Sequence, residues 1–506
     1  MNHHHQHSKS KSSKKDGNDD NDVILDVVVI GAGWAGLAAA KTLQQQQQQQ
    51  PQQPTFQILE ARNYVGGRSL TSYEFGQKYP VDMGSAWIHG KKRNPMQALL
   101  NEYGFRYAKC DYDSSIGFDE NGVRLESSEQ KSWASEARSF LKYMKKRQDK
   151  DDDDVSLEEA LCDYFKRKDI DPESRQARGL RTELEGRICY EYAANLSELS
   201  MFWWDMDEDL SGDDSFLAPL GSELGYSKLV GKYAETIMEH VRLETKVTKI
   251  VYGDDGLVTV DCVHASSGES LSSVRARHAI VTLPVGVLQQ NSVEFSPPLP
   301  APKRQAIQDL GMGVLNKIVL CWDMKVVTDE FLPMTREEEW IGQMVFPSTN
   351  NDEADKSSVQ PKLRVREFYC PNYFSKAKGQ QDDKVVLIGC CYGDDAKEIE
   401  TMTDEEATEA AVQSLRCVFG DDIVPDPTQS IVTRWQSDPY SRGSYSFQKL
   451  GAKGNKTRRD LAESPVGGNL WFAGEACHMK YPSTTHGALL SGESVGKRLS
   501  KAIRNQ

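Results

Sequence analysis

The pattern of apolar and polar positions predicts strands that alternate with helices. Asp26–Ile30 ends in four consecutive β-branched residues, which is typical of a strand buried on both faces of a parallel sheet. The Ala-rich segment Trp34–Leu43 predicts a helix directly after it, Thr55–Leu59 the next strand, and Asp404–Val418 a later helix. Further strand-like runs are Lys246–Val251, Ala279–Leu283, Leu315–Cys321, Val385–Cys390 and Asn469–Phe472. This alternation predicts an α/β fold with helices layered on a sheet.

Polar, low-complexity segments interrupt this pattern. Met1–Asp22 has no large apolar residue after Met1, so it cannot bury enough surface to fold, and we expect a disordered tail. Its histidines have no second ligand cluster nearby, so we predict no metal site. Gln44–Gln50 and Lys145–Asp154 are expected to be exposed loops. No apolar run is long enough to span a bilayer, and no signal peptide precedes Val23.

Length and charge exclude some classes of partner. The chain has 506 residues and a formal net charge of −14, so a broad basic face for nucleic acid is not expected, whereas a cationic ligand would be attracted. The ten cysteines contain no Cys-x-x-Cys pair, which favours reduced thiols in a reducing compartment. We therefore expect a cytoplasmic protein without a nucleic-acid, membrane or obligate protein partner. The lysines of the tail leave a nuclear location as the alternative.

A glycine motif between the first strand and the first helix predicts a dinucleotide site. Gly31, Gly33 and Gly36 form Gly-x-Gly-x-x-Gly. The first glycine makes the tight turn, the second lets the backbone approach a pyrophosphate, and the third lets the helix pack on the strand. The helix N-terminus supplies N–H groups for the phosphates. Glu60 ends the second strand, where a ribose hydroxyl needs an acceptor.

Two further segments favour a flavin dinucleotide. A basic turn that allows close approach follows the second strand and contains Arg62, Gly66, Gly67 and Arg68. Near the C-terminus a strand ends in Gly474 and Glu475, and Thr484 and Thr485 open a last helix. The N-terminus of that helix could support negative charge on an isoalloxazine ring, the alternative being an ordinary capped helix.

Six longer motifs follow one another along the chain, at Val28–Arg68, Val81–Gly90, Val281–Leu288, Gly311–Lys317, Trp435–Tyr445 and Leu470–Gly492. In content and order they resemble the flavin-containing amine oxidases, and most closely the polyamine oxidases of the spermine oxidase type. The resemblance implies FAD as cofactor and an enzyme that oxidises a carbon–nitrogen bond while oxygen is reduced to hydrogen peroxide. It therefore implies spermine- or spermidine-type polyamines and O2 as small-molecule substrates.

The resemblance also implies two interleaved domains. After the disordered tail, 1–22, a Rossmann-type FAD-binding domain would comprise residues 23–90, 221–295 and 432–506. A substrate-binding domain of mixed sheet plus helices would comprise residues 91–220 and 296–431.

The family's cofactor contacts can be carried over one residue at a time. Glu60 would bind the adenosine ribose, and Arg68 would lie near the phosphates. Val247 would contact the adenine through its backbone, and Glu475 would face the ribityl and phosphate region. The remaining implied contacts are Gly84 and Ser85 along the flavin, Thr484 and Thr485 at its pyrimidine edge, and Trp435.

Three residues are implied to act on the substrate. Lys317 matches the family lysine that holds a water beside the reactive flavin nitrogen, and burial would lower its pKa toward the range for proton transfer. His89 matches a histidine at the mouth of the active site, and Tyr445 would form an aromatic wall for the amine. Ser444 stands where monoamine oxidases have the cysteine that tethers the flavin, so we predict non-covalent FAD. Thr484 stands where those enzymes have a second aromatic ring.

Two alternatives stay open. A flavin-dependent histone lysine demethylase applies the same chemistry to a methylated lysine, but 197–283 and 320–432 contain no long heptad-bearing hairpin, which favours small polyamines. A flavin-binding scaffold without activity is the alternative of another class, and retention of Lys317 argues against it. Spermine, spermidine, thermospermine and acetylated polyamines are all candidate substrates. Candidate carboxylates for their distal ammonium groups are Glu191, Asp205, Asp207, Asp209 and Asp213.

Overall fold

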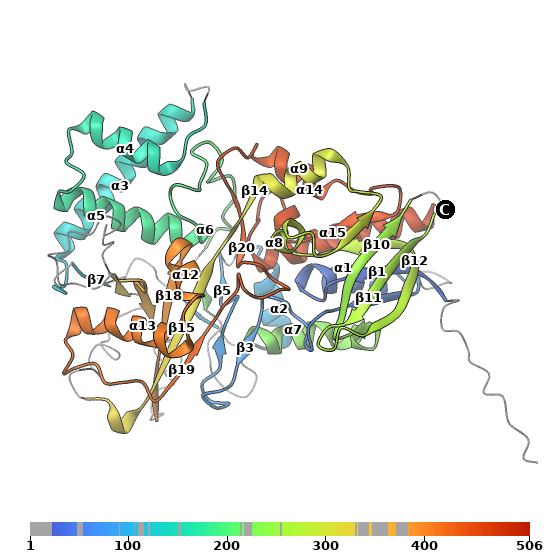
Figure 1. The fold of residues 1–506 in the computed structure, drawn as a ribbon, viewed down its shortest axis with the longest axis horizontal. Helices are drawn as coiled ribbons and strands as arrows, with labels where there is room; N and C mark the ends of the chain where they lie inside the picture. The colour runs from blue at the N-terminus through green and yellow to red at the C-terminus, as the bar shows by residue number, and fades with distance from the viewer. Residues whose placement is uncertain are drawn as a thin grey trace, which may run out of the picture.

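The computed structural model describes residues 23–505 except for 48–53, 91, 106, 110–115, 120–121, 150–152, 213–214, 217–224, 254–255, 329–330, 332–343, 347–362 and 371–382. The tail expected to be disordered, 1–22, lies outside the described residues, as does the candidate carboxylate Asp213. Two regions, each centred on a sheet, lie side by side, with the strand labels β1 and β12 in one and β15 and β18 in the other (Figure 1).

The first region contains an eight-stranded sheet with the order β13-β10-β11-β12-β1-β2-β9, in which β21 also pairs with β12. Its strands are β1 (Ile24–Ile30), β2 (Phe56–Leu59), β9 (Val241–Arg242), β10 (Thr245–Tyr252), β11 (Val258–His264), β12 (Ser270–Val281), β13 (Glu294–Ser296) and β21 (Leu470–Phe472). β1 pairs in parallel with β2 and β12, and β12 in parallel with β21. The carboxyl ends of these strands therefore share one edge, where open α/β sheets bind their ligands.

Helices cover both faces of this sheet. Val27 and Val29 of β1 face a layer formed by α1 (Trp34–Gln47), α2 (Pro95–Tyr103), α7 (Tyr226–Ala234), η4 (Glu235–His240) and α15 (Thr485–Arg504). Val28 and Ile30 face the layer of α8 (Val285–Gln289), α9 (Ala301–Asp309) and α14 (Asn455–Ala462). Burial on both faces explains why β1 lacks polar alternation. α1 and α15 cross so closely that a Cβ on Gly492 would lie 2.1 Å from the Ala35 carbonyl oxygen.

The second region contains a six-stranded sheet with the order β19-β15-β18-β17-β16-β7. Its strands are β7 (Ile116–Gly117), β15 (Leu315–Asp323), β16 (Met344–Val345), β17 (Glu367–Tyr369), β18 (Lys384–Tyr392) and β19 (Gln429–Val432). α12 (Gly393–Ile399), α13 (Asp404–Phe419) and the short η5 (Met324–Val326) pack with this sheet. A separate helical core is formed by α3 (Ser127–Gln148), α4 (Leu157–Lys168), α5 (Arg175–Leu184), the π-helix η3 (Glu185–Cys189) and α6 (Tyr190–Tyr192).

Short strands connect the two regions. The antiparallel pair β14 (Leu310–Gly313) and β20 (Tyr445–Gln448) lies between them in Figure 1. The other short strands are β3 (Thr71–Ser72), β4 (Val81–Asp82), β5 (Trp87–Ile88), β6 (Ala108–Lys109) and β8 (Ser215–Phe216). The short 3-10 helix η6 (Glu475–Cys477) follows β21. One apolar cluster joins Val81 and Met83 to Val319 of β15 and to Trp435, so the segment that follows β4 is held against the second sheet.

The predicted α/β class is confirmed, while several element limits were wrong. α1 continues to Gln47, because glutamine is a good helix former, so the start of the glutamine tract is helix rather than loop. For the same reason α3 includes Lys145–Gln148. β12 begins at Ser270 and ends at Val281, so Thr282 and Leu283 follow the strand. None of the described helices is long and apolar enough to cross a membrane. The domain boundaries stay a prediction.

Candidate active site

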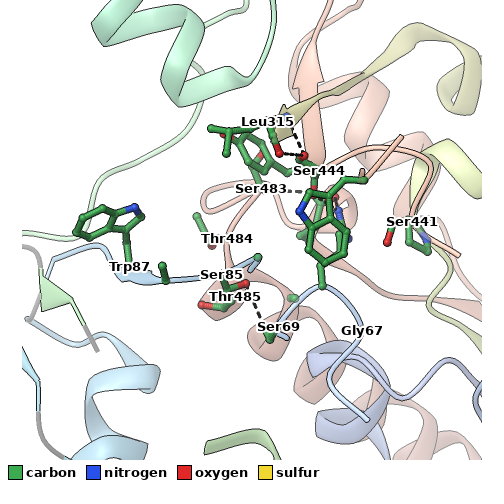
Figure 2. Close-up of a pocket in the computed structure, with 18 of the residues that line it drawn as sticks. Gly67, Ser69, Ser85, Trp87, Leu315, Ser441, Ser444, Ser483, Thr484 and Thr485 are labelled. Atoms are coloured by element: carbon green, nitrogen blue, oxygen red, sulfur yellow. Dashed lines mark hydrogen bonds and ion pairs between the residues drawn. The ribbon is translucent and has the colours of Figure 1, made fainter. Parts of the chain in front are cut away.

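A cavity of about 880 Å³ runs from the carboxyl edge of the first sheet to the second region. Of the cofactor-binding and catalytic residues predicted from sequence, all except Gly36 line it, although they come from segments spread between β1 and α15. In Figure 2, Gly67, Ser69, Ser85, Thr484 and Thr485 lie around one part of this cavity, and Trp87 lies further along it.

The turn between β1 and α1 forms one end of the cavity. Gly31 has a φ of +102°, which side-chain-bearing residues rarely adopt. A Cβ on Gly36 would lie 1.9 Å from the Gly31 carbonyl oxygen, so these two glycines are required by the turn itself. A Cβ on Gly33 would meet no atom within 4 Å, yet Gly33 lines the cavity. The packing of the chain therefore leaves free space at Gly33, as expected where a pyrophosphate approaches the backbone.

Glu60 follows β2 at the same end. Its carboxylate accepts hydrogen bonds from the N–H groups of Ala32 (2.7 Å) and Arg62 (2.8 Å). Each oxygen keeps a second lone pair, so a hydroxyl in the cavity could still be bound. Burial raises the pKa of Glu60, and the two backbone N–H groups oppose that shift. Val247 of β10 lies in the same part of the cavity wall as its neighbour Thr245.

The two predicted arginines are held in different ways. The Arg62 guanidinium donates to both carboxylate oxygens of Asp438, at 2.8 and 3.0 Å, and to the Ser441 hydroxyl. Arg62 is therefore fixed as part of the cavity wall. In the described contacts, Arg68 donates through Nη1 alone, to the Ser444 carbonyl (2.8 Å) and to Glu475 (3.2 Å). Of the two, Arg68 has more donors available to an anion in the cavity.

The start of α15 forms the next part of the wall. The Thr484 hydroxyl accepts a hydrogen bond from the Gly487 N–H at 2.9 Å, so Thr484 is the N-cap of the helix. Thr484, Thr485 and Ala488 line the cavity, so the first turn of the helix, with the partial positive charge of its N-terminus, borders the cavity. Glu475 accepts from the Ser446 hydroxyl and the Ser483 N–H, at 2.7 and 3.0 Å. Gly474 and Glu475 both line the cavity.

Gly84 and Ser85 lie opposite that helix. A Cβ on Gly84 would lie 1.8 Å from the Arg68 carbonyl oxygen, so only glycine allows the two segments to touch. The Ser69 hydroxyl donates to the Ser85 hydroxyl at 3.0 Å, which is drawn as a dashed line in Figure 2. The Trp435 indole N–H donates to the Met83 carbonyl at 3.3 Å, and its ring borders the same space.

Lys317 of β15 reaches the cavity from the second region. It is only 4% exposed, and its Nζ donates to the carbonyl oxygens of Asp82 (2.7 Å) and Gly84 (2.8 Å). Desolvation lowers the pKa of Lys317. Besides its bond to carbon, Nζ has three positions, and two of them hold N–H groups that donate to these carbonyls. The third position holds an N–H donor when the amine is protonated and a lone pair when the amine is neutral. Lys317 can therefore give a proton to a water in the cavity or take one from it.

Aromatic and acidic side chains line the part of the cavity beyond Lys317. The Tyr445 hydroxyl donates to the Tyr190 carbonyl at 3.1 Å, and burial raises the pKa of Tyr445, so its ring is neutral. Trp87, whose ring centroid lies 5.3 Å from that of Tyr369, and His89 also line this part. Of the candidate carboxylates, Glu191 and Asp207 line the cavity, whereas Asp205 and Asp209 are exposed residues that do not.

Several residues that line the cavity, or that hold its lining residues in place, were not predicted from sequence. Tyr190 and Trp133 lie on helices, where aromatic residues at helical spacing are indistinguishable from core. Asp438 sits within a predicted motif, but only the structure shows its bond to Arg62. Asn316 is fully buried, and its Oδ1 accepts hydrogen bonds from the Thr433 hydroxyl and the backbone N–H of Trp435. These partners lie more than 100 residues away, so no local sequence pattern indicates the contacts.

The residues present fit a flavin dinucleotide. A pyrophosphate would fit the free space at Gly33. It would also be stabilised by the two helix N-termini that border the cavity and by the remaining N–H donors of Arg68. Ser444 uses its hydroxyl to donate to the Leu315 carbonyl and accept from the Leu315 N–H, both at 2.9 Å. None of the described residues that line the cavity is a cysteine, so none offers a thiol for a thioether to the cofactor.

Comparison with known proteins identifies the class. The family model for flavin-containing amine oxidoreductases matches residues 34–499, so the chain belongs to that family. Polyamine oxidase 2 of Arabidopsis thaliana is 31% identical over 463 residues, covering 87% of this chain and 82% of that protein. A rice protein (Oryza sativa subsp. japonica), lysine-specific histone demethylase 1 homolog 2, is also 31% identical and covers 89% of this chain, but the match spans 54% of that protein.

Solved structures agree on the fold. The cyclohexylamine oxidase of Brevibacterium oxydans IH-35A superposes with a TM-score of 0.69 at 18% identity, covering 95% of this chain and all of that chain. A putrescine oxidase bound to putrescine gives 0.67 at 18% identity, covering 96% and 100%. The chain is thus an FAD-dependent amine oxidase, and the predictions of its family, cofactor and enzyme class are confirmed.

Proposed function

We propose that this enzyme is a polyamine oxidase. It oxidises the CH–NH unit of a spermine- or spermidine-type amine: R–CH2–NH–R′ + O2 + H2O gives R–CHO + H2N–R′ + H2O2. The products are an aminoaldehyde, a shorter polyamine and hydrogen peroxide. The observation that carries the proposal is the continuity of one cavity from Lys317 past the Tyr445 ring to Glu191, which suits a long cation with a reacting centre at one end. The similarity to a plant polyamine oxidase supports it.

The cofactor half of the cavity is proposed to hold FAD without a covalent bond. When bound, FAD accepts the hydride from the C–H bond next to nitrogen and passes two electrons to oxygen. Glu60 binds the adenosine ribose, Val247 borders the adenine, and the first turn of α1 and Arg68 bind the phosphates. Gly84, Ser85, Trp435, Glu475, Thr484 and Thr485 border the ribityl chain and the ring.

Lys317 is proposed to move a proton at Nζ. The Asp82 and Gly84 carbonyls occupy two of the three N–H positions of Nζ, and the third would hold a water in the cavity. The lowered pKa keeps the protonated and neutral forms of Lys317 closer in free energy than for an exposed lysine. Lys317 can therefore exchange a proton with that water without moving.

Tyr445 and His89 are proposed to handle the amine itself. The reacting nitrogen must be neutral, because only a lone pair assists departure of the neighbouring hydride. The Tyr445 ring provides a flat wall that excludes water beside this nitrogen, and the lost hydration disfavours the charged form. His89, which also lines this part of the cavity, accepts the ammonium proton.

Glu191 is proposed to bind a distal ammonium group. It lies next to Tyr190 on α6, so a substrate whose reacting nitrogen lies against Tyr445 extends toward it. Glu183 also lines this part, and its carboxylate accepts a hydrogen bond from Arg187 at 2.5 Å. A charge-assisted contact at Glu191 favours an amine with two or more positive centres over a monoamine.

Product analysis tests the substrate class. Purified enzyme would be given spermine, spermidine, thermospermine, N-acetylated polyamines and a dimethylated histone-tail peptide, with peroxide release measured and products identified by mass spectrometry. The proposal expects peroxide and a shorter polyamine from at least one free or acetylated polyamine. Turnover of the peptide alone would make the enzyme a histone lysine demethylase instead, and turnover of no amine would indicate a scaffold.

Two coarser assignments accompany this proposal. We assign the FAD-binding domain to 23–90, 221–295 and 432–506 and the substrate-binding domain to the intervening segments, which limited proteolysis of the holoenzyme tests. We also propose a cytoplasmic enzyme that acts without nucleic-acid or obligate protein partners. Microscopy of the full chain with a fluorescent tag, and its mass by size exclusion with light scattering, test those two statements.

A further inference from the structure

A π-helical turn interrupts the helix that borders the amine end of the cavity. η3 is inserted between α5 and α6, and the Tyr190 N–H donates to the Glu185 carbonyl five residues back. The Ala194 N–H likewise donates to the Cys189 carbonyl, at 3.3 Å. In an α-helix the Ala194 N–H would instead donate to Tyr190. In this wide register the Ala194 N–H therefore passes over the Tyr190 carbonyl.

Tyr445 uses that carbonyl. Its hydroxyl donates to the Tyr190 carbonyl at 3.1 Å, which is the contact that orients the ring from the far side of the cavity. Single π-turns inside helices are frequent at functional sites. An α-helical continuation would turn the residues after Leu184 by about 100°, the angle of one residue, and remove the acceptor from Tyr445.

A buried ion pair holds the π-turn in place. Arg366, which directly precedes β17, donates to Glu185, the first residue of η3. The other end of the guanidinium contacts Asp395 of α12 at 3.2 Å, and its carbon lies 5.2 Å from the centroid of the Tyr392 ring. Arg366, Glu185 and Asp395 have side chains only 12–14% exposed. The six-stranded sheet is thereby tied to the start of the π-turn.

We infer that this π-turn, held through Glu185 by Arg366, orients the Tyr445 ring for amine oxidation, so that Glu185 and Arg366 are positioning residues. The inference rests on the proposed role of Tyr445 as the wall for the amine. Neither residue lines the cavity. Their effect reaches the substrate through the Tyr190 carbonyl and the Tyr445 hydroxyl.

Glu185→Gln and Asp395→Asn form a matched pair of variants. Each removes one of the two carboxylates on Arg366 and leaves the other, so the buried arginine keeps one anionic partner. Only Glu185→Gln touches the π-turn. Tyr445→Phe removes the hydroxyl at the other end of the link, and Glu185→Gln/Tyr445→Phe combines both changes.

Two readouts are taken on the holoenzymes. In amide hydrogen exchange without substrate, Glu185→Gln should speed exchange in 190–194, while Asp395→Asn should leave these residues as in the wild type. In turnover with spermine, Glu185→Gln and Tyr445→Phe should each lower kcat/KM by about tenfold. The double variant should be no worse than either single variant, because both changes cut the same link.

Three results would overturn the inference. They are equal exchange in Glu185→Gln and Asp395→Asn, equal turnover in that pair, or losses in the two single variants that multiply in the double variant. Failure of the proposed function looks different, since wild-type flavin would then not be reduced by spermine. The hydrogen-exchange comparison still tests in that case whether Glu185 and Arg366 hold the π-turn in place, because this measurement uses no amine.

Discussion

The two ends of the cavity are built in different ways. The dinucleotide end is made of consecutive backbone, the β1–α1 turn from Gly31 to Gly36, with Glu60 on the neighbouring parallel strand. The amine end is made of side chains from distant elements: Lys317 on β15, Tyr445 on β20 and Glu191 on α6. Changes at the first end should therefore alter cofactor binding or folding, whereas changes at the second should alter turnover in an enzyme that still binds its flavin.

The largest effect is expected for Lys317→Met. Loss of the amine that exchanges a proton with water should lower kcat by about 100-fold or more with the flavin content unchanged. Lys303→Met is the matched control. Lys303 is another buried lysine, with a pKa lowered to about 8 by desolvation and Nζ bonded to the Asp460 and Glu463 carbonyls, but it lies outside the cavity. It should lower the thermal midpoint and spare kcat. Unchanged turnover in Lys317→Met would remove Lys317 from the mechanism.

Gly33→Ala and Gly36→Ala should separate cofactor binding from folding. The new methyl at position 33 meets no protein atom within 4 Å, so the apoprotein should keep its thermal midpoint. The same methyl intrudes on the pyrophosphate site and should weaken FAD binding by about 2 kcal/mol, roughly thirtyfold in Kd. At position 36 it meets the Gly31 carbonyl at 1.9 Å and should destabilise the fold itself. Equal Kd values for FAD in Gly33→Ala and the wild type would be incompatible with the assigned pyrophosphate site.

Glu191→Gln should affect only amines with a distal charge. Its loss should raise KM for spermine by about tenfold at nearly unchanged kcat, because the contact is made before and during the reaction alike. A monoamine of similar size should show no such rise, and Asp209→Asn, outside the cavity, should leave both substrates unaffected. A comparable rise in KM for the monoamine would mean that Glu191 shapes the cavity rather than binds the ammonium.

Asp82→Asn should have the smallest effect on turnover, because it acts on the pH dependence of stability. Burial raises the pKa of Asp82 from 3.8 to about 6, although it accepts from the Thr71 hydroxyl and Tyr226 N–H. Between these two pH values the folded state holds a proton that the unfolded state releases. The free energy of unfolding therefore falls as pH rises through this range, and above pH 6 the buried, ionised Asp82 lowers it by about 3 kcal/mol. The asparagine should remove that loss. The prediction is refuted if the free energies of unfolding of the wild type and of Asp82→Asn rise by the same amount from pH 4 to pH 7.

The same contrast explains what sequence could predict. The Gly-x-Gly-x-x-Gly spacing and the β-branched run at Val27–Ile30 are local, so β1, α1 and Glu60 could be placed without tertiary information. The motif carrying Lys317 was visible only through family resemblance. Its two carbonyl partners lie 235 and 233 residues away, at Asp82 and Gly84, and no periodicity encodes such a contact.

The errors have a similar origin. Helices α1 and α3 extend into stretches whose composition predicted loops. Glutamine and lysine are good helix formers, and each helix is anchored by apolar residues nearer its N-terminus. The π-turn could not be foreseen, because one extra residue in a helix leaves the polarity pattern of Glu185–Cys189 unchanged. The partner of its first residue, Arg366, lies 181 residues away in the sequence. Side-chain networks across the two regions therefore required the structure.

Anaerobic mixing of the purified enzyme with spermine tests the central claim most directly. The account predicts a yellow protein whose visible flavin absorbance disappears on mixing and returns when air is admitted. Denaturing the protein should release free FAD. Flavin absorbance that persists with spermine and with the other polyamines would contradict the claim that this cavity oxidises a polyamine.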